Sequence, residues 1–165
     1  MKPFEFIKAA STEEAVAALA EHGPGIRILA GGTDLLVDLK HAGQSPGVVM
    51  DVSGIDDLGA ISVDDDGLHI GAGATHTAIM TDPLIAEHAP AMIDAAHTVG
   101  AVQTRNLGTI GGNLVTCVPS MDSGPVLVAL EADVILAGAS GIRRLALTEF
   151  FVGPRKTILA AGEML

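Results

Sequence analysis

The first fifty residues alternate between short apolar stretches and amphipathic stretches, and this order constrains the fold more than any other feature of the sequence. Strand–helix–strand–helix–strand order within so few residues is typical of parallel crossover units. The sequence therefore predicts a βαβ-type N-terminal lobe. Its expected strands cover 4–7, 27–30 and 48–52, and its expected helices run from Ser11 to Gly23 and from Thr33 or Asp34 to near Gly43.

The pattern changes near residues 54–59, where we place the boundary between two lobes. Beyond it, the acidic turn at 64–67 (DDDG) predicts a hairpin, and Pro90 is expected to interrupt a helical stretch. Further expected elements are helices over 82–99 and 125–130, strands over 133–137 and 143–147, and the start of a strand at 163–165. The expected fold class is α+β, with a first lobe at 1–57 and a second lobe at 58–165 whose sheet is mainly antiparallel.

Composition excludes several functional classes. The chain has 165 residues with 9 basic and 20 acidic side chains, a net charge of −11 at neutral pH. A protein with this charge repels the phosphate backbone, so we expect no nucleic-acid partner. No apolar run is long enough to span a membrane, and the first residues lack the apolar stretch of a signal peptide, so we expect a cytoplasmic protein.

Metal and cluster chemistry have little support in the sequence. Cys117 is the only cysteine, so the chain alone forms no internal disulfide and holds no iron–sulfur cluster. The six histidines show no recognised ligand spacing, and we expect no metal site. The simpler interpretation is that these histidines are solvated or hydrogen-bonded surface residues.

Two glycine pairs are the strongest indication of a binding site. The first lies in 30–34 (AGGTD), between an expected strand and an expected helix, and the second lies in 108–113 (GTIGGN). Paired glycines let the backbone approach a ligand and turn its N–H groups toward it. Together with the positive end of a helix dipole, this arrangement favours a phosphate or pyrophosphate group.

Common nucleotide-binding and acyl-transfer motifs are absent from the sequence, which has no Gly-x-Gly-x-x-Gly after a strand, no P-loop and no Gly-x-Ser-x-Gly elbow. Asp122 is an isolated carboxylate in an otherwise uncharged stretch. Two interpretations of it stay open: it accepts hydrogen bonds from a ligand, or it caps the short helix next to it, and the sequence alone favours the cap.

Two segments resemble the flavin-binding loops of the molybdenum hydroxylase flavoproteins, which are the medium subunits of carbon monoxide dehydrogenase and related enzymes and the middle domain of xanthine dehydrogenase. Residues 30–35 (AGGTDL) are similar to the first loop, and residues 103–114 (QTRNLGTIGGNL) to the second. Residues 150–157 and 162–165 resemble the later segments of that family, so the resemblance covers essentially the whole chain. It implies a two-lobed, PCMH-like α+β fold with FAD held between the lobes.

The resemblance also implies which residues contact FAD. The first loop would wrap the pyrophosphate chiefly through backbone amides, and a second set would line the opposite wall. The implied residues are Ile28, Leu29, Ala30, Gly31, Gly32, Thr33, Asp34 and Leu35 in the first set, and Thr109, Gly112 and Asn113 in the second. Thr116 and Asp122 match further positions that touch FAD in the family. The C-terminal domain of the family does not occur in these 165 residues, so we expect a fragment that holds FAD weakly and forms oligomers.

The family's role predicts an FAD-dependent oxidoreductase subunit. Its FAD would relay electrons from the iron–sulfur clusters of a small subunit to an external acceptor, after a molybdopterin large subunit has taken them from substrate. No catalytic acid or base is expected, because electron transfer needs none. Two alternatives stay open: a self-contained FAD oxidoreductase, and a non-catalytic assembly domain of the same fold.

Overall fold

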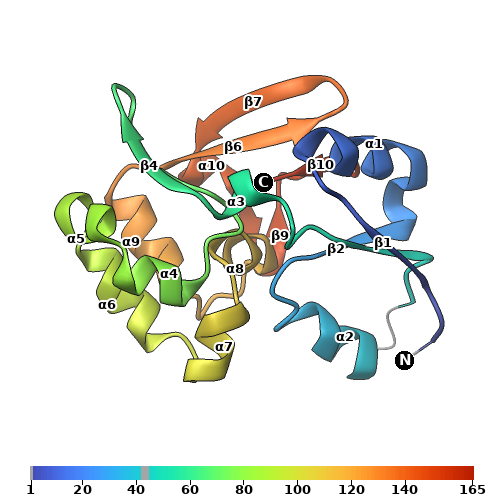
Figure 1. Cartoon of the computed structure of the whole chain (residues 1–165), viewed down its shortest axis with the longest axis horizontal. Coiled ribbons are helices and arrows are strands. Elements are labelled where there is room, and N and C mark those ends of the chain that lie inside the picture. Colours follow the sequence, from blue (N-terminus) through green and yellow to red (C-terminus); the bar gives the residue numbers. More distant parts are fainter. Residues whose placement is uncertain (1, 42–44) are drawn as a thin grey trace.

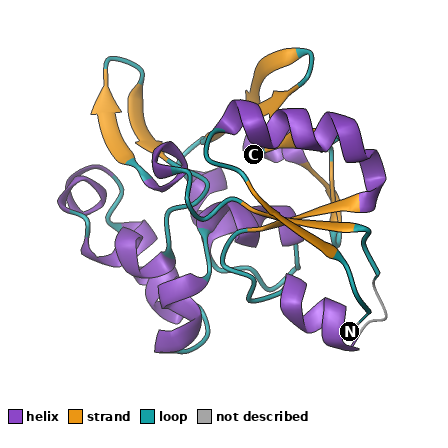
Figure 2. Cartoon of the chain, turned by 45° about the vertical axis from the view of Figure 1, so that its right-hand side comes forward, coloured by secondary structure: helices purple, strands orange, loops and turns teal. Residues whose placement is uncertain are grey.

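The computed structural model describes residues 2–41 and 45–165, and three strands near the N-terminus form a parallel sheet in it (Figure 1). The central strand β3 (Val48–Asp51) pairs with β1 (Glu5–Lys8) on one side and with β2 (Ile26–Leu29) on the other. Helix α1 (Thr12–His22) lies over one face of this sheet, and α2 (Leu35–His41) lies beneath the other (Figure 1 and Figure 2). The predicted βαβ-type lobe is therefore confirmed, while the expected end of the second helix near Gly43 lies outside the described residues.

Local hydrogen bonds explain where α1 begins and ends. The Glu14 N–H donates to Oγ of Ser11 at 3.2 Å, and the Ala10 N–H donates to Oε2 of Glu14 at 2.8 Å. The predicted cap is thus present, with Glu14 reaching one residue further back than in a standard capping box. Gly23 ends the helix with φ 53, and its N–H donates to the Leu19 carbonyl.

The other sheets of the described residues are antiparallel, as expected for the second part of the chain. The acidic turn closes a hairpin, and a second hairpin is extended into a three-stranded sheet by the C-terminal strand. The strands are β4 (Ile61–Asp64) with β5 (Gly67–Ile70), β6 (Asp133–Gly138) with β7 (Gly141–Ala146) and β10 (Glu163–Met164), and β8 (Phe151–Gly153) with β9 (Lys156–Thr157).

Short helices fill most of the remaining chain. They are η1 (Gly23–Gly25), α3 (Asp56–Gly59), α4 (His76–Thr81), α5 (Pro83–His88), α6 (Ala91–Thr98), α7 (Val102–Leu107), α8 (Ile110–Thr116), α9 (Ser123–Ala129) and α10 (Leu147–Phe150). Pro90 stands at the N-cap position of α6 and separates it from α5, as predicted. In the described parts of the chain, no helix is long and apolar enough to cross a membrane.

Two apolar clusters form the core. One gathers residues between 61 and 165 around the fully buried Phe150 and Met92, and the other gathers residues between 7 and 58 around Met50. Ala137 and Met164 pack into the second cluster although they belong to the C-terminal sheet. The second cluster thus contains residues from both parts of the chain. The division of the chain at residue 57 stays a prediction.

Candidate functional site

The two glycine-pair segments touch each other in the structure. A Cβ atom on Gly31 would stand 1.8 Å from the Leu107 carbonyl oxygen and 2.9 Å from Cα of Gly108. Thr33 reaches the same place, because its Oγ1 lies 3.5 Å from the position that a Cβ of Gly108 would take. Only glycine permits so close a backbone approach. Two segments that are distant in sequence therefore form one site, which we call the glycine junction (residues 31–33 with 107–108).

The first segment offers unpaired hydrogen-bond donors. Among the described residues, no protein acceptor takes the backbone N–H groups of residues 31–34. Gly32 has φ 71, in the left-handed region, and its carbonyl accepts from the Leu36 N–H at the start of α2. Consecutive free N–H groups next to a left-handed residue form a concave site for anionic oxygens. The segment therefore suits a phosphate or pyrophosphate group.

The second segment uses its own backbone donors within the fold. The Ile110 and Gly111 N–H groups donate to the carbonyls of Ala74 and Ala72 at 2.9 and 2.8 Å. Thr109 is the N-cap of α8, and its Oγ1 accepts from the Gly112 N–H at 3.1 Å. The second segment therefore offers a ligand its side chains and the exposed Gly112, whereas the free backbone donors belong to the first segment.

Helix α8 and the start of α9 hold the remaining candidates. The Ser123 hydroxyl, fully buried, donates to Oδ1 of Asn113, which leaves the Nδ2 group of Asn113 without a partner among the described residues. Thr116 lies one turn further along α8, half-buried and on the same side of the helix. Asp122 is exposed at the N-cap position of α9, yet its side chain makes no capping hydrogen bond. This disfavours the helix-cap interpretation of Asp122 and leaves its carboxylate available to a ligand.

His76 is a buried residue that the sequence interpretation missed. The residue is 2% exposed, its backbone N–H donates to the Gly108 carbonyl at 3.1 Å, and its ring lies against the same Gly108. The expectation that all the histidines are surface residues is wrong here, because α4 begins at the glycine junction and carries His76 beneath it. Burial lowers the pKa of His76, the charge of Asp122 raises it and the charge of Arg105 lowers it further.

A third run of small residues supports the junction and was also missed. Residues 71–74 (GAGA) accept the N–H groups of the second segment and pack against the backbone of Leu58. A Cβ on Gly71 would stand 2.2 Å from the Leu58 carbonyl oxygen, and one on Gly73 would stand 2.9 Å from it. The run of alternating glycine and alanine just before Thr75 was the available signal.

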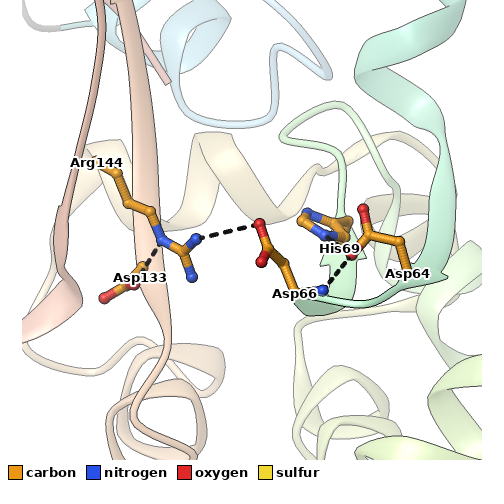
Figure 3. Close-up of polar contacts among 5 residues, drawn as sticks. All are labelled: Asp64, Asp66, His69, Asp133 and Arg144. Atoms are coloured by element: carbon orange, nitrogen blue, oxygen red, sulfur yellow. Dashed lines mark hydrogen bonds and ion pairs between the residues drawn. The ribbon is translucent and has the colours of Figure 1, made fainter.

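The acidic turn forms a separate polar cluster (Figure 3). The ring of His69 lies 2.8 Å from Asp64, and a hydrogen bond from this ring lowers the pKa of the Asp64 carboxyl. Arg144 on β7 donates to Asp133 at 2.6 Å and lies 3.9 Å from Asp66, so it links the two hairpins. These exposed contacts join two hairpins and do not reach the glycine junction.

The residues at and around the glycine junction fit FAD. The free N–H groups of residues 31–34 match its dianionic pyrophosphate. The Nδ2 group of Asn113 and the carboxylate of Asp122 match the acceptor and hydroxyl groups on the rest of the molecule. Gly31 and Gly32 carry no side chain that would cover these donors.

Known proteins are similar to this chain along its whole length. The family described as the FAD binding domain in molybdopterin dehydrogenase matches residues 2–165. The chain is 39% identical to the nicotinate dehydrogenase FAD-subunit of Eubacterium barkeri, over 100% of this chain and 57% of the relative. It is 32% identical to the carbon monoxide dehydrogenase medium chain of Hydrogenophaga pseudoflava, over 98% of this chain and 56% of the relative. The chain thus spans a little over half the length of these curated relatives.

Solved structures show the same fold. A chain in the structure of quinoline 2-oxidoreductase from Pseudomonas putida 86 superposes with a TM-score of 0.95 at 32% identity, over 99% of this chain and 58% of that one. A chain of carbon monoxide dehydrogenase from Hydrogenophaga pseudoflava gives a TM-score of 0.95 at 32% identity, over 100% of this chain and 58% of that one.

Proposed function

Because the chain belongs to the family of FAD-binding domains in molybdopterin dehydrogenases, we propose that it is the flavin domain of a molybdenum hydroxylase medium subunit. In this role it binds FAD and relays electrons from the iron–sulfur clusters of a small subunit to an external acceptor. The observation that carries the proposal is the run of free N–H groups at residues 31–34, held against the second glycine segment.

The chain's own residues have distinct tasks in this proposal. The N–H groups of the first segment hold the pyrophosphate, and the bare backbone of Gly31 and Gly32 lets it approach. Asn113, oriented by Ser123, donates from the opposite wall, and Asp122 accepts from hydroxyl groups of the cofactor. The full proposed set is Ile28, Leu29, Ala30, Gly31, Gly32, Thr33, Asp34, Leu35, Thr109, Gly112, Asn113, Thr116 and Asp122.

FAD, when bound, supplies the redox chemistry by accepting and releasing electrons. The protein positions the cofactor and excludes water from part of it, and no proton donor or acceptor of this chain is required. The proposal assigns the substrate site and the clusters to partner subunits, an iron–sulfur small subunit and a molybdopterin large subunit. The names of the relatives, an FAD-subunit and a medium chain, support such an assembly. A cytoplasmic location remains a prediction.

Flavin titration of the purified chain tests the proposal. FAD fluorescence should be quenched saturably, and pyrophosphate-containing ADP should compete with it. Gly112→Val should abolish binding, because a β-branched side chain would project from an exposed position of the wall. Gly54→Ala is the matched control, since a Cβ there has no neighbour within 4 Å. Absence of saturable FAD binding by the unsubstituted chain would overturn the proposal.

Co-purification separates the electron-relay function from the alternatives. Expressed together with the genes that flank its own, the chain should be isolated with subunits that contain iron–sulfur clusters and molybdenum. A flavin-loaded chain that oxidises a small substrate without such partners would instead support a self-contained oxidoreductase.

A further inference from the structure

Helix α8 has a buried side and an exposed side, and Asn113 lies where the two meet. Gly111 is buried, Gly112 is exposed and Asn113 is partly exposed. Residues four positions apart lie on the same face of a helix, so Asn113 stands one turn beyond Thr109, the first residue after the glycine junction. The exposed end of the Asn113 side chain therefore lies on the side of α8 that begins at the junction.

Ser123 holds the other end of this side chain. Its hydroxyl, at the start of α9, donates to Oδ1 of Asn113, and Ser123 is 0% exposed, so the oxygen of the amide is turned into the protein. In the described part of the chain, the only buried side-chain nitrogen or oxygen without a hydrogen-bond partner belongs to His76. Nδ2 of Asn113, which also has no partner there, is therefore open to solvent and to a ligand.

The buried hydroxyl also determines which end of the amide points inward. Among the described residues, the Ser123 proton has no acceptor other than Oδ1 of Asn113. If the amide turned over, Nδ2 would face the hydroxyl and the buried O–H group would be left without an acceptor, which is destabilising. An amide has an acceptor at one end and donors at the other. Position 113 therefore offers donors on the exposed side of α8.

We propose that Ser123 is a positioning residue of the cofactor site. Its buried hydroxyl holds the Asn113 amide with Nδ2 outward, and the site thereby selects a hydrogen-bond acceptor of FAD at this point. The proposal rests on the proposed function and adds a residue that does not itself contact the cofactor, since Ser123 is fully buried.

Two substitutions of Asn113 test the orientation of the amide. In Asn113→Asp the Ser123 hydroxyl can still donate to one carboxylate oxygen, but the other oxygen replaces the donor Nδ2 by a charged acceptor. The affinity for FAD at pH 7.5 should fall by about a hundredfold or more in Asn113→Asp and by about tenfold in Asn113→Ala. An Asn113→Asp variant that binds FAD as tightly as Asn113→Ala, or more tightly, would show that the amide oxygen faces the cofactor and would overturn the proposal.

A double-mutant cycle tests whether Ser123 acts through Asn113. Ser123→Ala should lower the affinity for FAD by about threefold to tenfold in the unsubstituted chain, because the amide is then free to turn over. In the Asn113→Ala background the same substitution should change the affinity by less than about twofold. Equal losses in the two backgrounds, or no loss in either, would show a purely structural role of Ser123 and overturn the proposal. Ser120→Ala is the matched control, because Ser120 is an exposed serine of the preceding turn and should leave the affinity unchanged.

A direct probe covers the case in which Ser123→Ala fails to fold. In the unsubstituted chain, the ¹⁵N resonance of the Asn113 side-chain amide should shift on saturation with FAD. An unchanged resonance at saturation would overturn the roles of Asn113 and Ser123 and leave FAD binding by the chain intact. Failure of the unsubstituted chain to bind FAD would instead overturn the proposed function, and this proposal with it.

Discussion

Replacing Gly31 by Ala tests whether close packing of the two segments at the glycine junction supports both stability and FAD binding. The new Cβ would stand 1.8 Å from the Leu107 carbonyl oxygen, whereas ordinary contacts begin near 3.4 Å. The two segments would therefore have to separate by about 1.6 Å, the difference of these distances. The obstacle is a backbone carbonyl, so no side-chain rotation relieves it.

The expected cost lies at the upper end of the range for overpacked sites, about 3 kcal/mol. In a domain of this size, each kcal/mol lowers the melting temperature by about 2–4 °C, so Gly31→Ala should melt about 6–12 °C lower. Separation of the segments also moves the N–H groups of residues 31–34 away from the opposite wall. We expect the affinity for FAD to fall by at least a hundredfold, or about 2.7 kcal/mol.

Thermal denaturation without FAD and flavin titration near 20 °C measure the two effects. Gly112→Ala is the informative comparison, because its Cβ would meet only Oγ1 of Thr109, at 3.0 Å, and the position is exposed. It should change the melting temperature little and still weaken FAD binding. Gly54→Ala should change neither quantity, since its Cβ has no neighbour within 4 Å. A Gly31→Ala variant with unchanged melting temperature and FAD affinity would refute the close packing of the two segments at the glycine junction.

Three further predictions concern side chains around the junction. Thr109→Val removes the acceptor of the Gly112 N–H, so thermal denaturation should show a loss of about 1 kcal/mol, whereas Thr109→Ser should melt close to the unsubstituted chain. Asp122→Asn should weaken FAD binding in flavin titrations more than Asp66→Asn, because Asp66 faces Arg144 in a separate cluster; equal effects would remove Asp122 from the site. Burial lowers the pKa of His76, so the unfolded chain takes up a proton first as the pH falls through about 6.5. Stability measured by urea denaturation without FAD should therefore decrease from pH 7.5 to 5.5, and less so in His76→Asn.

Local signals predicted the N-terminal part of the fold well. Ser11, Glu14 and Gly23 delimit α1 by contacts within a few residues, and Pro90 separates two helices by its own geometry. Helices α7 and α8 left no such signal, because six and seven residues are too few to show an amphipathic period. Tertiary hydrogen bonds from Ile110 and Gly111 to residues 72–74 help to fix the start of α8.

The sequence predicted that two glycine pairs form the candidate site. It did not predict that the two glycines of one pair have different roles. In the sequence Gly111 and Gly112 look equivalent, and we would expect valine at either position to affect only the ligand. In the structure a Cβ on Gly111 would stand 2.7 Å from both Cβ and the carbonyl oxygen of Ala72, so Gly111 is needed for packing. Gly112 is exposed, and a Cβ there would contact only Oγ1 of Thr109, the N-cap residue of the same helix. The difference between Gly111 and Gly112 arises from contacts with residues that are distant in sequence. Such contacts also bury His76.

The glycine junction also lies where the two cores meet. The first segment comes directly after β2, whose Ile26 belongs to one apolar cluster, and the second leads into α8, whose Ile110 and Leu114 belong to the other. A ligand held by both segments therefore bridges the two clusters and binds only when they are correctly placed. By linkage, FAD at a hundred times its dissociation constant should add about 2.7 kcal/mol to the stability of the whole chain. In the proposed site, backbone contacts at glycine thus couple cofactor binding to the packing of the fold, without a cluster of reactive side chains.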